Sequence, residues 1–239
     1  MKTTLIAVLA LGLLSATTNA EVVDLASPPI VDTSFEGGAT VYSANVPTAD
    51  ATRGWFEALG TSSWGDMIGP EGVTLPTTPY GTMWAGFGEG KYGRLYTQIG
   101  TVGNAGTATL RVAGLAAARS GYGWTDSGDV EIELWVAPTN FTGADGADLY
   151  GNANYLNGVS LTGADIFGAG FTAPTAAEFT TDIDVTLGPL QVGDNIWLSF
   201  AAVNGPGTAA GVAPDEGQRF FDNPGVAFPP PTGMVLWIR

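Results

Sequence analysis

Several segments of this chain alternate apolar and polar residues with a period of two, and this pattern constrains the fold more than any other feature. In residues 130–136 the even-numbered positions are aliphatic, whereas Glu131, Glu133 and Trp135 occupy odd-numbered positions. Residues 196–200 repeat the design, with Trp197 on the face opposite its aliphatic neighbours. Because successive side chains of a strand point to opposite faces, each segment predicts a strand with one buried face.

Residues typical of turns separate the alternating segments. The chain contains 35 Gly and 15 Pro, and no long segment has the 3.6-residue period of an amphipathic helix. Residues 107–112 and 182–187 also alternate, and weaker strand predictions fall on 40–43, 93–99 and 220–228. Short strands without intervening helices predict an all-β fold, an antiparallel and jelly-roll-like β-sandwich.

Two long stretches do not follow the alternation. Residues 53–92 are rich in aromatic side chains without a clean period, and residues 138–178 mix Gly, Ala, Asp and Asn. We predict that residues 138–178 form long loops.

The N-terminus has the pattern of a cleavable secretion signal. Lys2 precedes an apolar run of about ten residues, and small and polar residues follow up to Ala20. A membrane-spanning helix needs roughly 20 apolar residues, so we expect no membrane insertion after cleavage. Residues 1–20 are therefore predicted to be a signal peptide, 21–228 a single β-sandwich domain, and 229–239 a Pro-rich tail. The protein is expected to be secreted or to lie on the cell surface.

Composition excludes several kinds of chemistry. The chain has no His and no Cys, so it lacks the commonest general base, the Ser-His-Asp arrangement and thiolate metal ligands. A formal net charge of −15 disfavours nucleic acid and anionic lipid as partners. The carboxylates suit a hard cation such as Ca²⁺, although an acidic surface also serves solubility alone.

Short motifs at both ends and in the middle resemble exported bacterial jelly-roll domains. The opening Asp-Thr-Ser-Phe-Glu of residues 32–36, with Trp55 some twenty residues later, is similar to the first strand of these domains. Residues 95–99 resemble their Leu-Tyr-Gln-Ile strand, and residues 221–223 with Val226 their closing Phe-Asp-Asn-Val strand. The likeness is to galactose-binding-like and carbohydrate-binding-module-like domains, including many exosortase-sorted (PEP-CTERM) proteins, whose sorting tail this sequence does not contain.

The resemblance implies a structural Ca²⁺ between the first and last strands, with Glu36 and Asp222 as ligands. Two carboxylates and nearby carbonyl oxygens are suitable ligands for this ion. Pro224 and Gly225 interrupt the closing motif, and Glu36 and Asp222 could equally be ordinary carboxylates at strand ends.

Trp135 and Trp197 each lie on the strand face opposite the aliphatic residues. An indole on an outer face is costly unless something covers it, and sugars stack on such rings. The predicted carbohydrate site therefore combines these rings with polar neighbours, namely Trp135, Trp197, Glu131, Glu133, Tyr96, Gln98 and Arg111. The alternative is that the long loops, or residues 53–92, fold over this face and bury both rings as a second core.

Glu131 and Glu133 also suggest glycoside hydrolysis, which needs two carboxylates about 5–10 Å apart. Alternating Glu residues are nevertheless common on wet strand faces, so we expect no enzyme. The leading hypothesis is a non-catalytic protein that recognises extracellular polysaccharide or envelope glycan through aromatic platforms. A structural matrix or surface protein without a small ligand is the second hypothesis, and a carbohydrate-active enzyme is the third.

Overall fold

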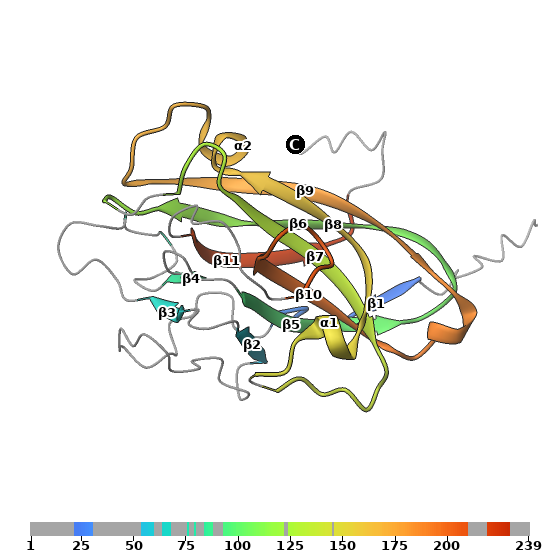
Figure 1. Cartoon of the computed structure of the whole chain (residues 1–239). Coiled ribbons are helices and arrows are strands. Elements are labelled where there is room, and N and C mark those ends of the chain that lie inside the picture. Colours follow the sequence, from blue (N-terminus) through green and yellow to red (C-terminus); the bar gives the residue numbers. More distant parts are fainter. Residues whose placement is uncertain are drawn as a thin grey trace, which may run out of the picture.

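The structure is a computed structural model, and it describes residues 22–30, 54–59, 64–67, 76, 79, 84–87, 93–121, 124–144, 146–209 and 219–229. Two antiparallel sheets face each other and form a β-sandwich (Figure 1). The fold class predicted from the alternation is therefore confirmed. No described helix is long and apolar enough to cross a membrane.

The first sheet, sheet A, has the strand order β1-β5-β10-β7-β8, with β2 also paired to β5. Its strands are β1 (Val23–Leu25), β2 (Trp55–Leu59), β5 (Gly93–Val102), β7 (Asp129–Ala137), β8 (Asn154–Thr162) and β10 (Asn195–Ala202).

The second sheet, sheet B, has the order β3-β4-β11-β6-β9. Its strands are β3 (Trp64–Met67), β4 (Trp84–Phe87), β6 (Gly106–Ala118), β9 (Thr175–Leu187) and β11 (Arg219–Ala227). Two short helices, α1 (Leu149–Asn152) and α2 (Gly163–Phe167), lie at opposite sides of the sandwich in Figure 1, and a 3₁₀ turn, η2, covers Pro189–Gln191.

The main core lies between the sheets. The inward positions of β7 and β10 supply Ile132, Leu134 and Leu198, all fully buried. Phe200 of sheet A stacks on Phe221 of sheet B with ring centroids 4.9 Å apart. The aliphatic faces predicted from the alternation are therefore the faces that the sandwich buries, which is what area-dependent hydrophobic stabilisation requires.

Most strand predictions are confirmed, and one loop prediction is wrong. The segments 107–112, 130–136, 182–187 and 196–200 all lie within strands. The prediction for 40–43 lies outside the described residues. The stretch 138–178 is not a long loop, because it contains α1, β8, α2 and the first residues of β9. In β8, apolar residues are mixed with Asn, Gly and Ser, so the sequence shows no clear two-residue alternation there.

Candidate functional site

The outer face of sheet A carries the side chains that the sequence singled out. The register pairs Trp197 of β10 with Trp135 of β7, and Ser199 with Glu133. Both indoles therefore share the face opposite the aliphatic core, as the alternation predicted.

This face is closed by other parts of the chain. The exposed fractions of Trp135 and Trp197 are 1 % and 0 %. Phe56 of β2 and Phe141 of the β7–β8 connection lie against Trp197, with ring centroids at 6.0 and 5.3 Å. The Tyr96 hydroxyl is bound to the carbonyl oxygens of Ala144 and Ala147 in the same connection.

The expectation of open aromatic platforms is therefore corrected. A second aromatic core, with Tyr96 and Leu149 also fully buried, occupies the position where a sugar was expected. The alternative that loops and the 53–92 segment cover both rings is the arrangement that the structure adopts.

A buried ionic network fastens the covering segments to sheet A. The Arg94 guanidinium donates to both Glu133 carboxylate oxygens, at 2.7 and 3.2 Å, and also binds Asp148 at the start of α1. Glu133 accepts further hydrogen bonds from Ser199 Oγ at 2.7 Å and from the Gly207 backbone N–H at 2.8 Å. Burial alone would lower the pKa of Arg94, but the bonds and negative charges of Glu133 and Asp148 outweigh it and raise that pKa.

The predicted sugar-binding carboxylates belong to this buried layer. Glu131 and Glu133 have exposed fractions of 1 % and 0 %, so a sugar cannot contact them in this conformation. Burial first, and then the charges of Glu133 and Glu131, raise the pKa of the neighbouring Tyr155 to about 12. Their shared strand face was predicted correctly, and Glu133 binds the covering segments through Arg94 and the Gly207 N–H.

The two remaining predicted sugar contacts lie on different sheets. Gln98 is exposed on β5 of sheet A, where its amide donates to Asn195 Oδ1 at 3.1 Å. Arg111 is on β6 of sheet B and forms a two-pronged ion pair with Asp182, at 2.7 and 2.8 Å. The seven predicted residues therefore do not form one site.

The predicted calcium pair is described only in part. Glu36 lies outside the described residues. Asp222 is fully buried on β11, and its Oδ1 accepts a hydrogen bond of 2.8 Å from the Asn223 backbone N–H. Within the described part of the chain, no three His, Cys, Asp or Glu side chains gather in a group that could hold a metal ion.

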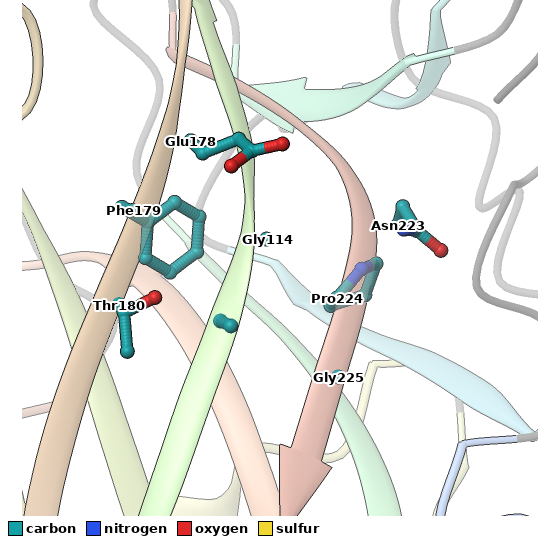
Figure 2. A pocket seen from close by; sticks show the side chains of 8 residues that line it. Gly114, Glu178, Phe179, Thr180, Asn223, Pro224 and Gly225 are labelled. Carbon is teal, nitrogen blue, oxygen red and sulfur yellow. The ribbon is translucent and has the colours of Figure 1, made fainter. Parts of the chain in front are cut away.

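A hollow of about 380 Å³ opens across three adjacent strands of sheet B. Figure 2 shows the side chains of β9 on one side, those of β11 on the other, and Gly114 of β6 between them. The lining residues are Ala113, Gly114, Glu178, Phe179, Thr180, Asn223, Pro224 and Gly225. Since Glu178 and Thr180 are exposed, the hollow faces solvent on the outer side of sheet B.

A β-bulge and small residues create this space. Asp222 pairs with Leu115, and Gly225 pairs with Ala113. Between these two pairs β11 contains one residue more than β6, which is a β-bulge. Asn223 takes a left-handed conformation there, with φ of 48°, which Asn tolerates better than most residues. Pro224 has no N–H to contribute to a ladder and suits the bulge.

The polar side chains of the hollow differ from those beside it in their hydrogen-bond and ionic partners. Along the same face, Arg111 pairs with Asp182, and the Thr109 hydroxyl donates to Asp184 at 2.6 Å. In contrast, the side chains of Glu178, Thr180 and Asn223 have no hydrogen-bond or ionic partner among the described residues. A carboxylate, a hydroxyl and an amide are thus available to a ligand at one point of the surface.

Sequence reasoning missed this site because its residues are far apart in the chain and individually ordinary. Of the predicted sugar contacts, Arg111 lies nearest to it, one outward position along β6 from Ala113, and the predicted calcium ligand Asp222 directly precedes the lining residue Asn223. The signal that could have indicated it is the interruption of the closing motif by Pro224 and Gly225, which forms the bulge in the structure.

Comparisons with known proteins find distant similarity to solved structures. No family model matches the sequence, and no curated protein matches it. Among solved structures, CBM28, a carbohydrate-binding module specific for non-crystalline cellulose, is 14 % identical, with a TM-score of 0.41, over 85 % of this chain and 94 % of that one. The CBM22-2 xylan-binding domain from Paenibacillus barcinonensis is 11 % identical, with a TM-score of 0.41, over 82 % and 98 %.

A Stig cyclase from Fischerella sp. TAU is also distantly similar. It is 14 % identical, with a TM-score of 0.47, over 83 % of this chain and 94 % of the cyclase. Binding modules and a cyclase are thus both distantly similar to this chain.

Proposed function

We propose that this protein is an exported, non-catalytic binding protein whose ligand is a carbohydrate held in the sheet B hollow. The observation that carries the proposal is a group of side chains, Glu178, Thr180 and Asn223, that have no partner among the described residues and surround a solvent-facing space of about 380 Å³. A few converging polar groups in a concave site are typical of small-ligand recognition.

The chemistry of these groups suits hydroxyl-rich ligands. The carboxylate accepts hydrogen bonds, the amide both donates and accepts, and the threonine hydroxyl does either. Phe179, with 6 % of its surface exposed, offers little ring area for stacking. Binding is therefore expected to depend on hydrogen bonds to sugar hydroxyls, and the platform mechanism expected from Trp135 and Trp197 is abandoned.

Two observations bear on the other hypotheses. The buried positions of Glu131 and Glu133 keep these carboxylates away from a glycosidic bond, which favours binding over hydrolysis. The covered outer face of sheet A favours the second hypothesis, a structural matrix or surface protein, because the Trp135 and Trp197 rings on that face are buried and closed to a ligand.

Changes in the hollow should weaken binding without unfolding the protein. Glu178→Gln removes the charge of one exposed side chain, and we expect about ten-fold weaker binding, because a hydrogen bond to a charged group contributes about 1.5–3 kcal/mol. Asn223→Gly keeps the positive φ accessible while deleting the amide, and should weaken binding three- to ten-fold. A glycan array identifies the ligand, and titration calorimetry measures the affinities.

Tyr150→Ala is the matched control for this experiment, because Tyr150 is a 54 % exposed aromatic residue of α1 on the other side of the sandwich. It should leave the affinity unchanged. Loss of binding in this variant alone would assign the ligand to the sheet A side, and the absence of binding to any glycan would favour the structural hypothesis.

The proposal also includes one structural Ca²⁺ bound by Asp222 and Glu36. Of these two residues, the structure describes Asp222. Because a metal bound only by the folded state stabilises it, a chelator should lower the unfolding midpoint, and added Ca²⁺ should restore it. Thermal melts with and without EDTA measure the shift. An unchanged midpoint would discard the Glu36 and Asp222 site.

A further inference from the structure

We propose that Glu178 is a specificity-determining residue that makes the hollow select uncharged glycans and reject anionic ones. This inference rests on the proposed function and concerns the charge of the ligand. It follows from the charges that the register of β6 and β9 brings to the outer face of sheet B.

The face around the hollow is negatively charged. The outward positions of β9 from Glu178 to Thr186 are all exposed and include Asp182 and Asp184. Their partners on the outward positions of β6, from residue 107 to residue 115, include one cation, Arg111. A polymer that carries carboxylates would meet like charges along this stretch, and repulsion between like charges lowers affinity.

Arg111 does not offset this repulsion, because its guanidinium is already paired with Asp182. The guanidinium binds both carboxylate oxygens of Asp182 through its Nε and Nη2 atoms. The hydrogen bonds with Arg111 lower the pKa of Asp182, so this carboxyl group stays ionised. An incoming carboxylate would have to displace Asp182 from the one cation on this described stretch of β6 and β9.

Glu178 is the carboxylate positioned to contact the ligand directly. It lines the hollow and projects from β9 toward β6 (Figure 2). A carboxylate has two acceptor oxygens and can take hydrogen bonds from two neighbouring hydroxyl groups. The same oxygens repel a carboxylated sugar, so one side chain both holds a neutral diol and excludes an acid.

The test compares neutral polymers with anionic derivatives of the same backbone. Cellulose, dextran and starch would each be used as the hydroxyethyl ether and as the carboxymethyl ether, in affinity electrophoresis and calorimetry. We expect the wild-type protein to bind the neutral form at least ten-fold more tightly at 0.15 M salt. The ratio should shrink at 1 M salt, where the screening length falls from about 8 Å to 3 Å.

Glu178→Gln should reduce the neutral-to-anionic ratio at least three-fold. Asp24→Asn is the charge-matched control, because Asp24 is exposed on β1 of sheet A, and it should retain the wild-type ratio. Equal wild-type binding of both forms would overturn the inference while leaving carbohydrate binding intact. So would an unchanged ratio in Glu178→Gln, or an equal change in Asp24→Asn. Failure of every polymer, neutral and anionic, to bind would overturn the proposed function and the inference with it.

Discussion

Replacing Arg94 by methionine is expected to lower the free energy of unfolding by about 3–5 kcal/mol, because it leaves the buried Glu133 carboxylate without its counter-ion. Arg94 and Glu133 are both fully buried, and Arg94 also lies over the Trp135 ring, 4.7 Å from its centroid. The change would further release Asp148, which caps α1. Urea unfolding followed by circular dichroism measures the loss.

Arg111→Met provides the matched control for that experiment. Arg111 and Asp182 form an ion pair of similar geometry, but their side chains are 36 % and 41 % exposed. Exposed pairs contribute at most about 1 kcal/mol, so this variant should unfold almost as the wild type does. Equal losses in the two variants would contradict the view that burial makes the Arg94 network structurally decisive.

Trp197→Ala is expected to destabilise the fold by about 3–5 kcal/mol, the usual cost of deleting a buried aromatic side chain. The indole is fully buried, and its ring lies edge-on to Tyr96 with centroids 5.6 Å apart. Its removal would leave a cavity beneath the β7–β8 connection. The milder Trp197→Phe variant should lose less, because most of the cavity stays filled.

The control for Trp197 is Tyr150→Ala, which should change the stability by less than about 0.5 kcal/mol because Tyr150 is 54 % exposed. Denaturant melts compare the variants, and iodide quenching reports whether Trp fluorescence is shielded from solvent. A nearly neutral Trp197→Ala variant with strong quenching would indicate that the outer layer of sheet A is open in solution and would revive the aromatic-platform hypothesis.

The strands that could be predicted are those whose two faces differ. In β7, in β10 and in the second half of β9, inward-facing apolar residues alternate with outward-facing ones, so the pattern survives in the sequence. β8 escaped prediction because its burial alternates poorly, with side chains that are half-buried or exposed throughout. The outer layer of sheet A was predicted only as one of two alternatives, since no local pattern reveals which loop will cover a given face.

The candidate site depended on long-range pairing. Glu178 and Asn223 are separated by 45 positions in the sequence, and only the order β11-β6-β9 brings them to one hollow. The side chains themselves carry no distinguishing motif. Their availability to a ligand became visible only when the neighbouring carboxylates proved to be paired.

The period-two alternation in the sequence determined the β-sandwich fold and which strand faces point inward. It also determined that Trp135 and Trp197 lie on one face. Composition determined the absence of imidazole and thiol chemistry. Tertiary structure alone decided that this common face is covered, and that the open polar surface lies on the other sheet. The physical reason is that a period-two pattern specifies which way a side chain points, whereas burial depends on what packs against it from elsewhere in the chain.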